Sequence, residues 1–208
     1  EGVLYSLEHR EDVFFVLTYD RGAKNFNLMK TPVLQTERKH WQEVLAHRND
    51  VLLDQISVFK DFLVVVERAN ALKKLRVFDL ALKTDYYIEF DEPVFSANIG
   101  ANIEYESSTL RYTYTSLVTP TSVYDFQMKT RRNQLKKQQE VVGGYNKEEY
   151  VSERLYAEGY DGTTIPISLV YKKTTRPSAK TPLYLYGYGA YGISVDPNFS
   201  SYRLSMLD

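Results

Sequence analysis

Short apolar runs separated by polar turns recur at a nearly constant interval along the first two thirds of the chain. Three of these runs have the pattern of β-strands and cover residues 13–19, 62–68 and 110–116, so that their starts lie 49 and 48 residues apart. Each is preceded by one further apolar run and followed by two more. These flanking runs cover residues 3–7, 26–29, 41–46, 51–59, 75–80, 85–90, 94–99, 122–128 and 134–141. The pattern therefore predicts three groups of four short strands.

Four strands for every ~40 to 50 residues are typical of the blades of a β-propeller. A single four-stranded blade leaves one face uncovered, and stacking blades around an axis buries that face. Because a closed propeller needs roughly four to eight blades, three blades predict only the last part of one. An antiparallel sandwich whose strand spacing resembles a repeat by chance is the alternative.

A change of composition near Gly143-Gly144 divides the chain. The residues before the glycine pair are polar and those after it are charged, which is typical of an interdomain connection. We therefore expect propeller blades over residues 1–142, a linker over 143–150, and a second domain over 151–208. The chain begins at Glu1 without an initiator methionine, which predicts that it is part of a longer protein.

The region after the linker predicts a different kind of sheet. Alternating runs at residues 151–157 and 164–171 flank Asp161-Gly162, a hairpin signal because both residues tolerate positive φ. An apolar strand is then expected at residues 183–186, running into a loop rich in glycine and tyrosine. Two antiparallel strands followed by a buried strand that ends in glycines are typical of the start of an α/β-hydrolase sheet. The expected fold is thus mostly β, a partial propeller followed by the first strands of a hydrolase domain.

Composition supports strands over helices and narrows the classes of partner. The chain has 18 tyrosines and 10 phenylalanines, which favour strands. The two sizeable helix candidates, residues 36–46 and 131–142, also fit polar connections with a strand attached. With 26 Lys and Arg against 27 Asp and Glu, the net charge is −1, which argues against nucleic-acid and anionic-membrane partners and favours peptides or small molecules. The basic run at residues 129–137 is then a solvated turn.

The absence of cysteine removes several kinds of chemistry. A chain with no cysteine has no disulfide, thiolate zinc site or cysteine nucleophile, and it fits a reducing compartment, so we expect a cytoplasmic location. The three histidines, His9, His40 and His47, all fall in the first predicted blade and lack a third ligand at a spacing that would bind a metal. We expect no metal and no cofactor. No apolar run approaches the ~18 residues needed to cross a bilayer.

Several blocks of sequence resemble the prolyl oligopeptidase family of serine peptidases, and the resemblance covers nearly the whole chain. The Tyr-Gly-Tyr-Gly block is shared broadly in the family, whereas the Ser-Glu-Arg-Leu and Ile-Pro-Ile-Ser-Leu-Val-Tyr blocks are more similar to the oligopeptidase B (protease II) branch. The blocks cover residues 117–125, 139–145, 152–157, 161–162, 165–171 and 185–192.

The resemblance implies a seven-bladed propeller above an α/β-hydrolase domain, with a Ser-Asp-His triad at their interface. It also implies cleavage of short peptides after Lys or Arg, and it makes this chain an internal fragment with the last three blades, the linker and the first catalytic strands. Two alternatives stay open: cleavage after Pro within the same family, and a non-catalytic propeller that serves as an interaction module.

Two tyrosines are the candidate site residues. The family pattern implies that the Tyr188 hydroxyl contributes to the oxyanion hole, where losing one donor typically costs about 3 to 4 kcal/mol of transition-state stabilisation. Gly187 and Gly189 are expected to let the chain turn sharply around it. Tyr191 occupies the place of an aromatic residue that lines the substrate pocket. Without the family pattern, both are ordinary tyrosines packed at a strand end or in a loop.

The nucleophile that such a site would serve is absent from the 208 residues. No Gly-x-Ser-x-Gly elbow occurs, and the nearest string, residues 192–196, lacks the second glycine. We therefore expect the catalytic Ser, Asp and His beyond residue 208 and no activity from this fragment alone. Because an open wedge of blades exposes strand edges and one blade face, we also expect self-association.

Overall fold

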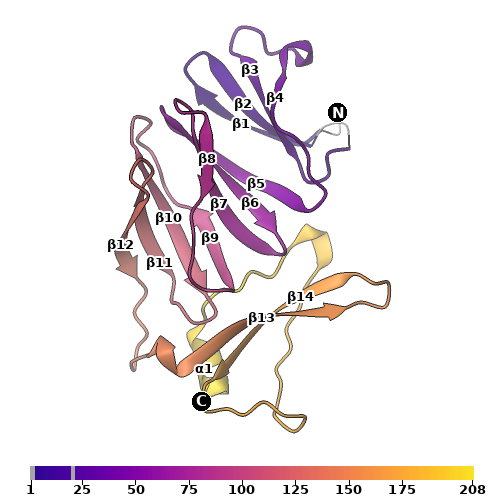
Figure 1. The fold of residues 1–208 in the computed structure, drawn as a ribbon, viewed down its shortest axis with the longest axis vertical. Helices are drawn as coiled ribbons and strands as arrows, with labels where there is room; N and C mark the ends of the chain where they lie inside the picture. Colours follow the sequence, from indigo (N-terminus) through magenta and orange to yellow (C-terminus); the bar gives the residue numbers. More distant parts are fainter. Residues whose placement is uncertain (1–2, 20–21) are drawn as a thin grey trace.

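The computed structural model describes residues 3–19 and 22–208 (Figure 1); Glu1 lies outside them. Three four-stranded antiparallel sheets follow one another along the chain, each in the order of the sequence. The first sheet holds β1 (Tyr5–Arg10), β2 (Val13–Thr18), β3 (Asn27–Pro32) and β4 (Gln42–Leu45). The second holds β5 (Val51–Val58), β6 (Phe62–Ala69), β7 (Leu72–Asp79) and β8 (Thr84–Tyr87). The third holds β9 (Phe95–Ile99), β10 (Thr109–Ser116), β11 (Ser122–Gln127) and β12 (Arg132–Gln138).

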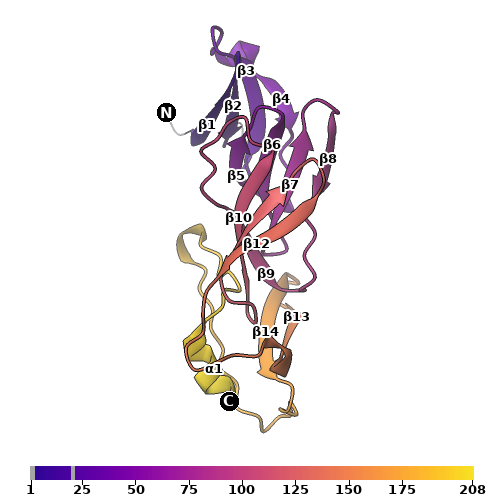
Figure 2. The ribbon, with the colours of Figure 1, turned by 90° about the vertical axis from the view of Figure 1, so that its left-hand side faces the viewer.

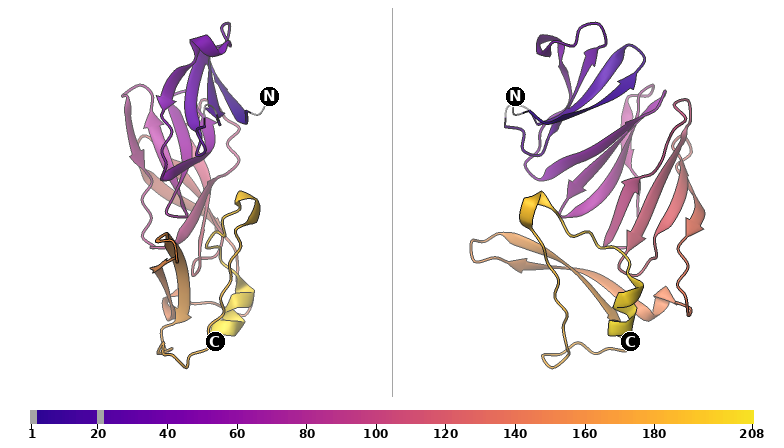
Figure 3. Two further views of the ribbon diagram at one scale, coloured as in Figure 1. Left: turned by 90° about the vertical axis from the view of Figure 1, so that its right-hand side faces the viewer. Right: turned by 180° about the vertical axis from the view of Figure 1, so that it is seen from behind.

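The three predicted groups of four strands are confirmed, and the sheets fan out from one another as propeller blades do (Figures 1 and 3). We call them blade 1, blade 2 and blade 3. Among the described residues the three blades do not close into a ring. Blade 1 lies at one end of the molecule, and the C-terminus lies at the opposite end (Figure 1).

Strand β6 explains why the blades stack. Its sequence is FLVVVERA, and its first five residues are apolar. Successive side chains of a strand point to opposite faces of the sheet, so a continuous apolar run fits a strand whose two faces are both covered by neighbouring blades. Leu63 and Val65 pack in a core with residues of blade 1, whereas Val64 and Val66 pack in a second core with residues of blade 3. The outermost strand β12 is exposed along its whole length, so a run of charged and amide side chains is tolerated there.

Both segments that carried a helix signal contain strands. Residues 36–46 form a short 3₁₀ turn, η1 (Arg38–His40), followed by β4, and residues 131–142 contain β12. The alternative interpretation of these segments, a polar connection with a strand attached, is therefore confirmed. The only helix of more than one turn among the described residues is α1 (Ser201–Leu207), and no described helix is long and apolar enough to cross a membrane.

The predicted hairpin after the linker is also present. A 3₁₀ turn, η2 (Lys147–Glu149), leads into β13 (Tyr150–Glu158), which pairs along nine residues with β14 (Thr164–Lys172). The connection is five residues long, residues 159–163, and Gly162 adopts a φ of 80° in it. The Asp161 carboxylate accepts a hydrogen bond from the Thr163 N–H at 3.0 Å, which closes the turn.

The predicted buried strand at residues 183–186 is wrong. These residues form no strand, and their side chains are 66% to 77% exposed. A strand needs a neighbouring backbone for its N–H and C=O groups, and no described strand lies alongside this segment to supply one. Of the three strands expected after the linker, the described chain therefore contains the two strands of the hairpin, β13 and β14.

Candidate functional site

Tyr188 and Tyr191 lie in the extended segment that follows β14. The Tyr188 side chain is 48% exposed and that of Tyr191 is 93% exposed, so neither is a packed core aromatic. In the described part of the chain the Tyr188 hydroxyl has no hydrogen-bond partner. The structure does not bring the two rings together in a cavity with another candidate residue. The loop stands out to one side of the sheets (Figure 2).

The sharp turn of this loop lies at Tyr191-Gly192. These two residues have φ values of 56° and 69° in the 3₁₀ turn η3 (Ala190–Gly192), and the Ile193 N–H donates to the Ala190 carbonyl at 3.1 Å. Gly189 has a φ of −147°, so the expectation that the glycines beside Tyr188 provide the turn is wrong. A non-glycine residue with positive φ is uncommon and is often found at functional sites.

The segment after this turn is anchored on the propeller blades. Asp196 forms a bidentate ion pair with Arg68 of β6, with Oδ1–Nη1 and Oδ2–Nη2 distances of 2.5 and 3.3 Å. Three residues later the Phe199 N–H donates to the Thr115 hydroxyl of β10 at 3.1 Å. The Phe199 ring meets Tyr145 of the linker edge-on, with ring centroids 5.2 Å apart. Residues 196–199 therefore contact blade 2, blade 3 and the linker together.

Two further contacts join the linker and hairpin to the same ends of the blades. The Tyr145 hydroxyl donates to the Val118 carbonyl in the β10–β11 turn at 2.6 Å. Arg154 of β13 donates to the Asn70 carbonyl in the β6–β7 turn and, at 2.6 Å, to the Ser168 hydroxyl of β14. The blade turns, the hairpin and the segment that carries Tyr188 thus meet at one junction, as the ribbon shows from behind (Figure 3).

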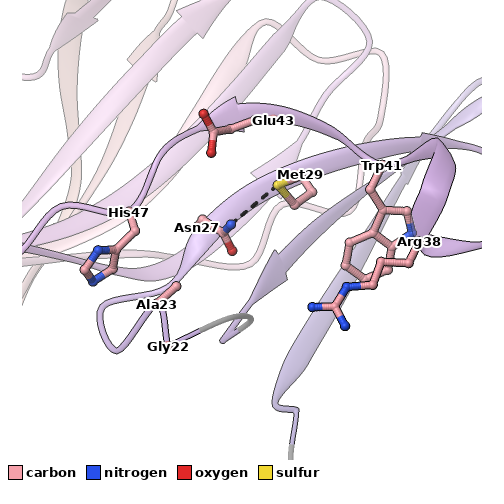
Figure 4. A pocket seen from close by; sticks show the side chains of 8 residues that line it. All are labelled: Gly22, Ala23, Asn27, Met29, Arg38, Trp41, Glu43 and His47. Atoms are coloured by element: carbon pink, nitrogen blue, oxygen red, sulfur yellow. Dashed lines mark hydrogen bonds between the residues drawn. The ribbon is translucent and has the colours of Figure 1, made fainter.

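A separate cavity of about 330 Å³ lies in blade 1, away from this junction (Figure 4). The residues that line it come from β3, β4 and the loops beside them: Gly22, Ala23, Asn27, Met29, Arg38, Trp41, Glu43 and His47. Asn27 Oδ1 and His47 Nε2 are buried there without hydrogen-bond partners. Met29 lies opposite Val16 and Glu43 in the sheet, on the face that points away from the core shared with blade 2.

His47 is one of the residues that line the blade 1 cavity, but among the described residues no group of three His, Asp or Glu side chains is placed to hold a metal ion. Neither of the two candidate tyrosines lines the cavity. The junction, and not the blade 1 cavity, is therefore the candidate functional site.

Burial sets the ionisation of several tyrosines in the blades and the linker. Burial raises the pKa of Tyr86 to about 12, and its hydroxyl donates to the Met128 carbonyl at 2.6 Å. Burial is also the main cause that raises the pKa of Tyr112, Tyr114 and Tyr145 above the ordinary value. These groups stay neutral at physiological pH and serve as packing and hydrogen-bonding groups.

The sequence-based reasoning did not find Arg68, Asp196, Thr115 or Arg154 as residues of the junction. Arg68 and Asp196 are 128 residues apart, and no local motif connects them. Asp196 ends the string of residues 192–196, which lacks the second glycine of a serine elbow.

Comparison with known proteins adds three findings. The family model described as "Prolyl oligopeptidase, N-terminal beta-propeller domain" matches residues 1–139. Dipeptidyl aminopeptidase BI of Pseudoxanthomonas mexicana is 43% identical over 99% of this chain, and Protease 2 of Moraxella lacunata is 32% identical over all of it. Oligopeptidase B from Leishmania major superposes with a TM-score of 0.88 at 32% identity over the whole chain. The chain spans 28% to 30% of the lengths of these three proteins.

Proposed function

Because the chain belongs to the prolyl oligopeptidase family, we propose that it is part of a serine peptidase in which the blades cover a hydrolase domain that begins near residue 151. The observation that carries this proposal is that similarity to peptidases extends over 99% to 100% of the chain, past the blades and through the Tyr188 loop. In this proposal residues 1–142 are the last blades, 143–150 the linker and 151–208 the start of the catalytic domain.

Tyr188 would supply one donor of the oxyanion hole. Its hydroxyl is accessible and has no partner within the described chain, so it is free to donate to an oxygen that becomes negative in the transition state. A preorganised donor of this kind stabilises the transition state more than the bound substrate. Tyr191, at 93% exposure, would contact the substrate.

The full-length protein carrying Tyr188→Phe tests this role. Removing the hydroxyl should lower kcat by about 100-fold or more, since one oxyanion donor contributes about 10²–10³ in rate, and KM should change little. Tyr186→Phe is the matched control, because Tyr186 is 66% exposed in the same segment and has no assigned role. An unchanged kcat for Tyr188→Phe would refute the oxyanion assignment.

We propose an oligopeptidase B-like specificity, cleavage of short peptides after Lys or Arg. The support is the similarity to the Leishmania oligopeptidase B and the blocks at residues 152–155 and 165–171. The 43% identical relative is named a dipeptidyl aminopeptidase, which favours a second candidate, the release of dipeptides from a free amino end. Cleavage after Pro is the third reaction to be compared.

Three fluorogenic substrates separate these reactions in the full-length protein. An amino-blocked peptide ending in Arg should be cleaved fastest by an oligopeptidase B-like enzyme. A dipeptide substrate with a free amino end should be preferred by an aminopeptidase, and a blocked peptide ending in Pro by a prolyl enzyme. The 208-residue chain, assayed beside the full-length protein, should show no turnover, because it lacks the serine elbow. Preference for Pro would overturn the specificity that we propose.

A further inference from the structure

The ion pair between Arg68 and Asp196 joins a blade strand to the segment that follows the Tyr188 loop. Both side chains are largely buried, with 13% and 18% of their side-chain surface exposed. Asp196 lies eight positions after Tyr188 and four after the end of η3. An anchor at Asp196 therefore limits where the loop can move.

Lys73 extends this pair into a four-residue cluster. Lys73 lies directly opposite Arg68 in the β6–β7 register. Two positively charged residues are therefore cross-strand neighbours. The Lys73 Nζ is 2.9 Å from Asp54 Oδ2 and 4.0 Å from Asp196 Oδ2, and it donates to the Asn98 amide oxygen at 2.8 Å. Asp54 reaches Lys73 from a bulge in β5 between Leu53 and Gln55.

The blades alone do not neutralise this cluster. Lys73 has Asp54 and Asn98 as partners within the blades. Within the described chain, the carboxylate that pairs with Arg68 comes from Asp196. With the segment docked and the Asp196 charge removed, Arg68 would have no carboxylate partner among the described residues, and an unpaired buried charge is strongly unfavourable. Loss of the Asp196 charge therefore weakens docking mainly at Arg68.

We propose that Arg68, through Asp196, is a positioning residue for the Tyr188 loop: the ion pair docks residues 193–199 against blade 2 and thereby holds the oxyanion donor in place. The contact of Phe199 with Thr115 and Tyr145 acts in the same direction on the C-terminal side of Asp196. This inference rests on the proposed peptidase function for its catalytic consequence, but docking itself does not require activity.

Hydrogen exchange of the full-length protein tests the docking. In Arg68→Ala and in Asp196→Asn, the amides of residues 193–200 should exchange at least about tenfold faster than in the unmodified protein, because local opening sets their exchange. The kcat should fall about tenfold or more with KM within about threefold, since a small displacement of a catalytic group costs up to about 100-fold. The exchanged pair, Arg68→Asp with Asp196→Arg, should recover most of the lost protection and rate.

Arg111→Ala is the matched control. Arg111 forms a bidentate pair with Asp125 of blade 3 at 2.7 and 2.8 Å. Arg111→Ala therefore also removes a bidentate arginine–aspartate ion pair, but one that does not involve residues 193–199. It should leave the exchange of this segment and kcat unchanged. If Arg68→Ala does not fold, the isosteric Asp196→Asn decides alone.

Unchanged exchange of residues 193–200 in Asp196→Asn would overturn the proposal, and so would equal effects of Arg68→Ala and Arg111→Ala. If the full-length protein has no peptidase activity, exchange still decides whether the pair docks the segment. In that case only the kcat expectation fails, together with the proposed function.

Discussion

Among the described residues of the blades, Glu67 is the most deeply buried charged side chain, with 2% of its surface exposed. It lies on the face of β6 that packs toward blade 1. Arg48, from the loop between blades 1 and 2, approaches it to 2.6 Å, Arg76 to 3.3 Å, and the Tyr87 hydroxyl donates to it at 2.7 Å. Arg76 in turn pairs with Asp85 at 2.7 Å. One carboxylate therefore holds together groups of blade 2 and the loop that joins it to blade 1.

Replacing this carboxylate should be costly. Glu67→Gln leaves two guanidinium groups with less counter-charge in a buried place, and breaking a buried pair in this way typically costs about 3–5 kcal/mol. Urea unfolding of the full-length protein, followed by a probe in the blades, measures the change. Glu106→Gln is the control: its pair with Lys60 is exposed, and such pairs contribute about 0–1 kcal/mol. Similar losses for both variants would contradict the role given to Glu67.

Single residues became candidates only where a local motif marked them. The assignment of Tyr188 rests on the resemblance of the Tyr-Gly-Tyr-Gly block to the family pattern, and it stays a prediction. By contrast, Arg68, Asp196 and Glu67 are charged residues in unremarkable surroundings, and their importance depends on partners that folding brings together from distant parts of the chain. Even the turn beside Tyr188 was misplaced, because positive φ falls on Tyr191 and Gly192 and not on the flanking glycines.

At the scale of elements, the repeat predicted the three blades well. Each strand predicted within the blades overlaps an observed one, since period-two patterning and turn residues are both local signals. The two failures have different causes. Residues 183–186 have the composition of a strand but no pairing neighbour, and α1 is seven residues long, too short for its period to be distinguished from a loop.

The whole molecule is a wedge of blades joined to a hairpin and an extended segment, and its contacts are unevenly distributed. Blades 1, 2 and 3 share two apolar cores. The C-terminal segment is instead held by polar contacts at Arg68, Thr115 and Tyr150, whose hydroxyl donates to Asp208 at 2.7 Å. The blades are thus joined by burial of apolar surface, whereas the segment with Tyr188 is joined by a few directional bonds that separate variants can break.

Because the three blades do not close into a ring, the face of blade 1 that points away from blade 2 is not covered by another blade of the described chain. Tyr5 and Leu7 are 64% and 50% exposed, and they lie opposite Thr18 and Val16 on the same sheet face. In the isolated 208-residue chain we propose that this face drives self-association, because contiguous exposed apolar surface favours contact with another copy.

Sedimentation velocity of the 208-residue chain at increasing concentration measures this association. Leu7→Lys should shift the distribution toward monomer, because a charge cannot be buried in an apolar contact without a partner. Leu34→Lys is the matched control, since Leu34 is 96% exposed in a loop and its replacement should leave the distribution unchanged. A single monomer species at all concentrations, or equal effects of both variants, would mean that this blade face is not an association surface.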